Sequence, residues 1–108
     1  MEETASDRVK LKFARRSLGE IERGKRDWLA QRDKNPELFE EELAEAIENI
    51  KAIPAFGSPT GMLSRGRQVR RVEMRKTKYQ VYYRQEGTEW VVILCVWAGK
   101  RRTKPKLK

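Results

Sequence analysis

The sequence predicts an α+β domain in which a helical hairpin packs on a mainly antiparallel sheet, in the order β-α-α-β-β-β. Two observations predict this fold. Apolar residues recur with a helical period over residues 18–50, and they alternate or run continuously over residues 9–13 and 69–97. The length of 108 residues, 38 % of them apolar, suits one compact domain with a modest core.

The first strand and the first helix are expected near the N-terminus. Residues 9–13 alternate apolar and basic side chains, as in a strand with one buried face. Ser17 and Glu20 have the spacing of a capping box, although the helix could also begin near Ala14. The stripe that this helix is expected to bury consists of Leu18, Ile21, Lys25, Trp28 and Leu29. Gly19 and Gly24 weaken the helix by about 1 kcal/mol each relative to Ala, so packing must hold it.

A second helix is expected to start at Asn35-Pro36, with Asn as the cap and Pro at the first helical position. Its apolar stripe consists of Phe39, Leu43, Ala46, Ile47 and Ile50. Its outer face carries the carboxylates of Glu37, Glu40, Glu41, Glu42, Glu45 and Glu48. We interpret this face as solvated, or as a shield for the basic half of the chain. Pro54 ends the helix, and residues 57–61 are expected to be a turn-rich connection.

Three strands should complete the sheet, over Val69–Arg75, Tyr79–Arg84 and Trp90–Trp97. In the first, Val72 and Met74 should share one face, with Arg71, Glu73 and Arg75 on the other. The last is apolar at both odd and even positions, so both of its faces are apolar, which predicts a central strand covered on both faces. Residues 1–7 and 104–108 are expected to be mobile tails of a single domain that spans residues 1–108.

The net charge of +9 is unevenly distributed. Residues 1–54 contain 11 Lys and Arg against 13 Asp and Glu, whereas residues 55–108 contain 14 against 3. Such an asymmetric field favours an acidic partner, which could be RNA, DNA or an acidic protein segment. It is also compatible with a basic protein that is merely soluble.

Several kinds of chemistry are excluded by what the sequence lacks. There is no histidine, so the usual general base near neutral pH and any Ser-His-Asp triad are excluded. The single cysteine, Cys95, lies in an apolar run and is expected to be buried and inert. No phosphate-binding glycine loop occurs, and we expect no metal and no cofactor. The polar N-terminus and short apolar runs predict a cytoplasmic protein with no leader peptide and no membrane contact.

What remains is a concentration of arginine, lysine and tyrosine in the second half of the chain. Arg and Lys can neutralise phosphates, and Tyr can stack on a base or move a proton. The structural alternative is that the arginines form a solvated face and that Tyr82 or Tyr83, whichever faces the helices, belongs to the core.

The chain resembles the ParE-like branch of the RelE/ParE superfamily of toxins over residues 9–102. Three groups of motifs carry the resemblance, and their order and spacing are more specific than any one of them. They are Trp28-Leu29-x-x-Arg32 with Asn35-Pro36-x-Leu38-Phe39-x-Glu41-Glu42-Leu43-x-x-Ala46-Ile47 and Pro54-x-x-Gly57, then Val69-Arg70-Arg71-Val72, then Thr77-Lys78-Tyr79-Gln80-Val81-Tyr82-Tyr83 with Val92-Ile93-Leu94-x-Val96-Trp97.

The resemblance implies a toxin of a type II toxin–antitoxin system, neutralised by an acidic antitoxin. One branch of the superfamily cleaves mRNA on the ribosome with Lys, Arg and Tyr side chains, and the ParE-like branch poisons DNA gyrase. Arg71 and Arg101 occupy places where the nuclease branch has basic functional residues. Glu73 stands where that branch has a lysine and Gln80 where it has an arginine, and no tyrosine follows Arg101. Losing a charged hydrogen bond to phosphate costs roughly 1.5–3 kcal/mol, so these departures favour the gyrase hypothesis.

We therefore expect a gyrase-directed toxin whose target-binding surface consists of Arg71, Arg75, Lys100, Arg101 and Arg102, supported from beneath by Trp97. The antitoxin is expected in a groove between the helices and the sheet, rimmed by Arg70, Arg71 and Arg84. A heterotetramer or a larger assembly with the antitoxin is compatible with this hypothesis. The alternatives are an endoribonuclease acting on the ribosome and mRNA, with Arg71 and Arg101 as the catalytic candidates, an inactive antitoxin-binding module, or an unrelated basic nucleic-acid binder.

Overall fold

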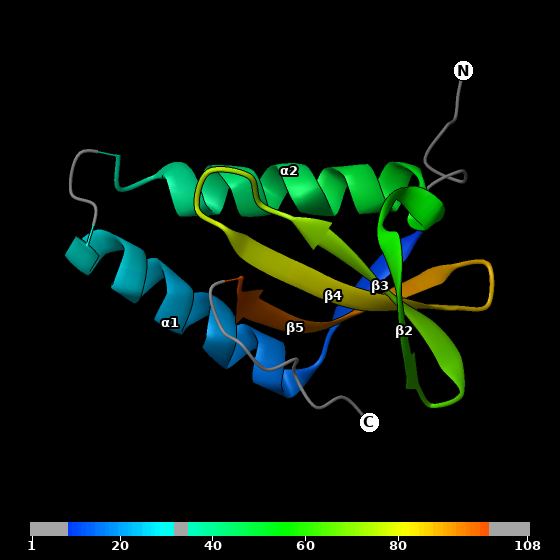
Figure 1. Ribbon diagram of the computed structural model, residues 1–108. Coiled ribbons are helices and arrows are strands. Elements are labelled where there is room, and N and C mark those ends of the chain that lie inside the picture. Colours follow the sequence, from blue (N-terminus) through cyan, green and yellow to red (C-terminus); the bar gives the residue numbers. More distant parts are fainter. Residues whose placement is uncertain (1–8, 32–34, 100–108) are drawn as a thin grey trace, which may run out of the picture.

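The computed structural model describes residues 9–31 and 35–99. In this part of the chain, two helices and a short 3-10 helix pack with a five-stranded sheet (Figure 1). The elements are β1 (Lys10–Phe13), α1 (Arg15–Gln31), α2 (Leu38–Ala52), η2 (Pro54–Phe56), β2 (Ser58–Ser64), β3 (Arg67–Glu73), β4 (Tyr79–Glu86) and β5 (Trp90–Ala98). The α+β class and the helical hairpin are confirmed. The expected tails, 1–7 and 104–108, lie outside the described residues.

The strand order across the sheet is β1-β5-β4-β3-β2. β1 runs parallel to β5, and the other three neighbouring pairs are antiparallel, so the sheet is mainly antiparallel as expected. β5 lies between β1 and β4, and its residues from Val91 to Val96 are all buried. The apolar character of both faces of this strand is therefore explained by its interior position.

The sheet has one strand more than the sequence predicts, because residues 58–64 form the edge strand β2. The turn-rich composition of residues 57–61 was misleading here. Pro59 lacks an N–H group but is tolerated because β2 lies at the edge of the sheet. The pairing with β3 is interrupted between Pro59 and Leu63, and there the Thr60 hydroxyl donates to the Val69 carbonyl at 2.8 Å.

Helix α1 begins at Arg15, which agrees with a start near Ala14 and shows that the capping box is wrong. The buried Ser17 hydroxyl donates back to the Ala14 carbonyl at 2.6 Å. Glu20 instead accepts the backbone N–H of Val96 in β5 at 2.9 Å. The expected stripe is only partly correct: Ile21, Lys25 and Trp28 are half-buried, whereas Leu18 and Leu29 are exposed.

Helix α2 begins at Leu38, a few residues later than expected, and Asn35 is not its cap. The Asn35 carbonyl accepts the indole N–H of Trp28 at 2.8 Å, which ties the loop to α1. The expected apolar stripe is confirmed: Phe39, Leu43, Ala46 and Ile50 are buried, and Ile47 packs against them.

Apolar side chains form a core cluster on each face of the sheet. The larger cluster joins α2 to residues such as Val72, Tyr83 and Ile93, with Ile21 and Trp28 of α1 packed against it. We call this side of the sheet the helix face. The opposite side, the far face, has a smaller cluster of Val69, Tyr82, Val92, Leu94 and Cys95. Cys95 is a buried free thiol, as expected.

Tyr83 is the tyrosine that faces the helices. Its hydroxyl donates to the Pro54 carbonyl at 2.6 Å and accepts the Gly57 N–H at 2.8 Å, so it fixes the segment that links α2 to β2. Burial raises the pKa of Tyr83, and the hydrogen bond from Gly57 and the charge of Arg70 oppose that rise only in part. Tyr83 is therefore a structural residue.

Candidate functional site

The far face brings together Arg71, where the chain keeps a basic residue as the nuclease branch does, and Glu73 and Gln80, where the chain departs from that branch. Side chains alternate along a strand, so Arg71 and Glu73 share the far face with Val69. In the β3–β4 register, Arg71 lies opposite Tyr82 and Glu73 lies opposite Gln80. The resemblance singled out Arg71, Glu73 and Gln80 in the sequence, and the register makes Glu73 and Gln80 direct neighbours and adds Tyr82 beside Arg71.

Two rows of side chains cross the strands at this place. The first joins Arg71 to Tyr82, and the second joins Glu73 to Gln80 and then to Trp97 of β5. The buried Tyr82 hydroxyl donates to the side-chain oxygen of Gln80 at 3.0 Å. Trp97 is half-buried and packs against the small far-face cluster.

The chemistry of this cluster is that of a binding surface with one cation. Arg71 supplies a half-exposed guanidinium, and Glu73 supplies an exposed carboxylate on the same face. A carboxylate repels a phosphate at the position where a cation would stabilise it. The Tyr82 proton is directed to Gln80, an amide that cannot act as a base at ordinary pH.

The three arginines expected on the rim of an antitoxin groove lie in three different environments. Arg70 is on the helix face, where its guanidinium donates to the Gly57 carbonyl at 2.8 Å. Its neighbour Arg71 is on the far face, because adjacent strand residues point to opposite sides. Arg84 is 6 % exposed and donates to the Ser64 hydroxyl at 2.9 Å and to Glu86.

The expectation that Arg84 presents its charge to a partner is therefore not supported by its position. The hydrogen bond from Arg84 lowers the pKa of the Glu86 carboxyl, partial desolvation opposes it, and the charge of Arg84 adds to the lowering. Arg84 and Glu86 form an ion pair that holds the ends of β2 and β4 together through Ser64.

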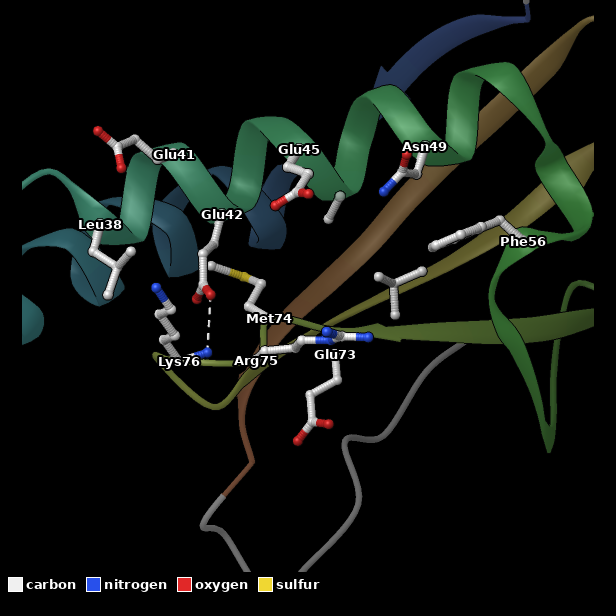
Figure 2. Close-up of a pocket in the computed structure, with 12 residues that line it drawn as sticks. Leu38, Glu41, Glu42, Glu45, Asn49, Phe56, Glu73, Met74, Arg75 and Lys76 are labelled. Carbon is white, nitrogen blue, oxygen red and sulfur yellow. Dashed lines mark hydrogen bonds between the residues drawn. The ribbon is translucent and has the colours of Figure 1, made fainter.

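A groove of about 500 Å³ lies between α2 and β3, and none of those three arginines lines it (Figure 2). The buried residues Ala46, Val72 and Met74 are among those that line it. Leu38 and Phe56 lie toward its two ends (Figure 2). The residues that contribute charge are Glu41, Glu42, Glu45, Glu73, Arg75 and Lys76. The expected groove between the hairpin and the sheet is thus present, but one wall is acidic and the basic charge is at the β3–β4 turn.

Glu42 closes the groove on the side of the β3–β4 turn. Its carboxylate accepts the backbone N–H of Lys76 and that of Thr77, both at 2.9 Å, and the Thr77 hydroxyl at 2.9 Å. Figure 2 shows Glu42 reaching from α2 down to this turn. The sequence did contain a signal, because Glu42 falls between Phe39 and Ala46 on the buried side of the helix.

The remaining candidates are Arg75, Lys100, Arg101 and Arg102. Arg75 is exposed in the β3–β4 turn, and residues 100–102 lie outside the described part of the chain. The last described residue, Gly99, donates its N–H to the Lys78 carbonyl at 2.6 Å, so β5 ends beside this turn. In residues 9–31 and 35–99, no His, Cys, Asp and Glu side chains gather in a metal-binding group, and no helix is long and apolar enough to cross a membrane.

Comparison with known proteins assigns the chain to a family. Residues 11–103 match the family model described as "ParE toxin of type II toxin-antitoxin system, parDE". The chain belongs to the ParE toxin family. This ParE-family protein is therefore the toxin component of a type II toxin–antitoxin system.

Solved structures agree with that assignment at the level of the fold. A chain of the chromosomal ParDE toxin–antitoxin system from P. aeruginosa superposes on this toxin with a TM-score of 0.66 and 14 % sequence identity. The match covers 85 % of this chain and 97 % of the P. aeruginosa chain. No curated protein sequence matches the chain.

Proposed function

We propose that this toxin acts on DNA gyrase in the cytoplasm, rather than on mRNA. The observation that carries the proposal is the pairing of Glu73 with Gln80 on the far face, beside Arg71 and Tyr82. A ribonuclease needs cations around the scissile phosphate and a group that moves a proton, and this cluster offers a single guanidinium. A gyrase poison needs only to bind and to hold the enzyme in its cleaved-DNA state.

The proposed target-binding surface consists of Arg71, Arg75, Lys100, Arg101 and Arg102. It is supported by the position of Gly99, which lies beside the turn that carries Arg75. The half-buried Trp97, two residues before Gly99, anchors the end of β5 on the far-face cluster. The exposed side chains of Arg75, Lys76 and Lys78 at this end of the sheet suit a large acidic partner such as a nucleoprotein complex.

The test is to induce the toxin without an antitoxin and to measure gyrase-dependent DNA breaks and mRNA cleavage in the same cells. We expect breaks that disappear in Arg101→Glu/Arg102→Glu but persist in Arg23→Glu/Arg26→Glu, which makes the same charge change on the exposed side of α1. Codon-specific mRNA cleavage with intact supercoiling would establish the ribonuclease alternative. Normal growth on induction of a folded protein would indicate an inactive antitoxin-binding module.

We further propose that the antitoxin segment lies in the α2–β3 groove. Its apolar side chains would pack on Ala46, Val72 and Met74, and its carboxylates would face Arg75 and Lys76. The charge at that end supports an acidic segment, whereas Glu41 and Glu45 favour a basic or neutral residue toward α2. A heterotetramer or larger toxin–antitoxin assembly is part of this proposal, and light scattering of the purified complex measures it.

Association with the antitoxin should slow as salt rises, because the rim charges attract the partner through solvent. Arg75→Glu/Lys76→Glu should weaken the complex at least tenfold through faster dissociation and slower association. Arg23→Glu/Arg26→Glu should leave the affinity nearly unchanged. An on-rate that does not depend on salt would contradict the proposed site.

A further inference from the structure

A second groove, of about 400 Å³, lies at the opposite end of the sheet from Arg75. Its lining residues are Arg67, Gln68, Arg70, Gln85 and Gly87. They come from the start of β3, the end of β4 and the β4–β5 turn. Figure 1 shows that the β2–β3 and β4–β5 turns lie at this same end of the sheet.

Arg70 is held in place before any ligand arrives. One nitrogen of its guanidinium donates to the Gly57 carbonyl at 2.8 Å and approaches the Ala55 carbonyl at 3.4 Å. Gly57 is fixed in turn by the hydroxyl of Tyr83, which accepts its N–H at 2.8 Å. The guanidinium still has N–H groups that make no hydrogen bond to residues 9–31 and 35–99. A fixed cation loses little side-chain entropy on binding an anion.

The side chains that line the groove favour an oxyanion as its ligand. In residues 9–31 and 35–99, no carboxylate forms an ion pair with Arg67 or Arg70, and no carboxylate lines the groove. Gln68 and Gln85 add amide groups that donate and accept hydrogen bonds. Guanidinium groups bind phosphate oxygens in bidentate geometry, and amides complete such a contact.

Two further observations narrow the class of ligand. Among the described residues, no apolar side chain lines the groove, unlike the α2–β3 groove, so none is available for an amphipathic peptide to pack on. No aromatic side chain of the described ranges lines it either, although unpaired bases need aromatic side chains for stacking. Duplex nucleic acid exposes its phosphates and keeps its bases stacked inside, so it needs neither apolar nor aromatic side chains in its binding site.

We propose that this groove is a binding site for the phosphodiester backbone of duplex DNA, with Arg67 and Arg70 as the phosphate ligands. The contact is independent of sequence, because it involves no base edge. It is separate from the surface proposed to meet gyrase, and it would let the toxin contact DNA at one end of the sheet while the other end contacts a protein. The site does not depend on which enzyme the toxin inhibits.

The experiment measures binding of the full chain to a short fluorescent DNA duplex of mixed sequence at several salt concentrations. Arg67→Gln/Arg70→Gln should lower the slope of log affinity against log salt by about 1 to 2, because each lost phosphate contact removes about one counterion. Arg23→Gln/Arg26→Gln removes the same charge from α1 and is the matched control. Arg67→Gln alone, at a side chain with no ion pair among the described residues, guards against a folding defect at Arg70.

Lysine at both positions keeps the charge but loses the bidentate geometry, so Arg67→Lys/Arg70→Lys should retain most of the salt slope with weaker binding. Equal losses in the groove variant and the α1 control would overturn the site, because net charge would then explain both. The same variants are also tested for binding to a polyglutamate peptide and to single-stranded RNA. If Arg67→Gln/Arg70→Gln weakened binding to one of these and left duplex binding unchanged, the proposal would be overturned and the groove would be assigned to that ligand. No gyrase is present in this measurement, so its failure leaves the gyrase proposal standing.

Discussion

Glu42 is the side chain that ties α2 to the β3–β4 turn, and its carboxylate accepts three hydrogen bonds there. Partial burial raises the pKa of Glu42, but the N–H groups of Thr77 and Lys76 and the Thr77 hydroxyl outweigh it, so the net shift is downward. A carboxyl with a lowered pKa in the folded state stabilises the fold above its ordinary pKa of 4.5. That contribution is lost as the pH falls below 4.5 and through the folded-state pKa.

We therefore predict that Glu42→Gln is less stable than the wild type by about 1–3 kcal/mol at neutral pH, since charged hydrogen bonds are lost. The difference between the two proteins should shrink as the pH is lowered below 4.5. Urea unfolding at a series of pH values measures it. Glu45 lies three residues further along α2 and is exposed, so Glu45→Gln is the control and should change stability little at any pH.

The sequence predicted which residues belong to the candidate site better than it predicted how deeply each side chain is buried. Strand alternation predicted one face for Arg71 and Glu73, and the resemblance singled out Gln80, but the face of Tyr82 was left open. The register then placed the four together. The environment of Arg84 did not follow, because its burial depends on Ser64 from β2, a strand that the sequence did not predict. A buried arginine paired with a half-exposed glutamate has no signature in a single sequence, since both partners resemble surface residues.

At the scale of elements, Gly24 is the residue of α1 that lies against Phe39 of α2 and Tyr79 of β4. A Cβ atom at Gly24 would lie 2.6 Å from Cζ of Phe39. Phe39 has no exposed surface, and its ring packs edge-on against Tyr79 with centroids 4.9 Å apart. Because the ring is fully buried in a close-packed core, a Cβ atom at position 24 would displace it, so Gly24 permits the close approach of α1 to Phe39.

Gly24→Ala should therefore destabilise the fold by about 1–3 kcal/mol through overpacking, despite its better helix propensity. Gly19→Ala in the same helix is the matched control, because nothing lies within 4 Å of a Cβ at that position. It should stabilise the protein by about 1 kcal/mol. Thermal unfolding of both variants checks the prediction, and similar melting temperatures would refute it.

Helical elements were easier to predict than the edge of the sheet, for a physical reason. The stripe of α2 follows from periodicity because packing selects apolar residues every three or four positions. β2 contains Pro59, Thr60 and Gly61, which are typical of turns, and its irregular pairing with β3 is held by the Thr60 hydroxyl. An edge strand with one neighbour can tolerate such residues, so composition alone does not reveal it.

At the scale of the whole molecule, stability depends on β5. Ile93 has no exposed surface and belongs to the larger cluster that joins the sheet to α2. Ile93→Ala should reduce the free energy of unfolding by roughly 2–5 kcal/mol, because it leaves a cavity between the layers. Leu18→Ala, at a side chain that is 52 % exposed, should cost about 0.5 kcal/mol or less. Denaturant titration of the two variants measures the difference, and equal losses would contradict the central position of β5.

The parallel pairing of β1 with β5 has a consequence for synthesis of the toxin. Lys10 lies beside Trp90 in the sheet, so the first strand meets its partner only after nearly the whole chain has been translated. Until Trp90–Ala98 leaves the ribosome, β1 and β4 both lack the strand that lies between them. The nascent chain can pair β2, β3 and β4 but cannot complete its sheet. During this interval the toxin is synthesised but not yet folded, and a cell that makes antitoxin at the same time can accumulate it before the toxin folds.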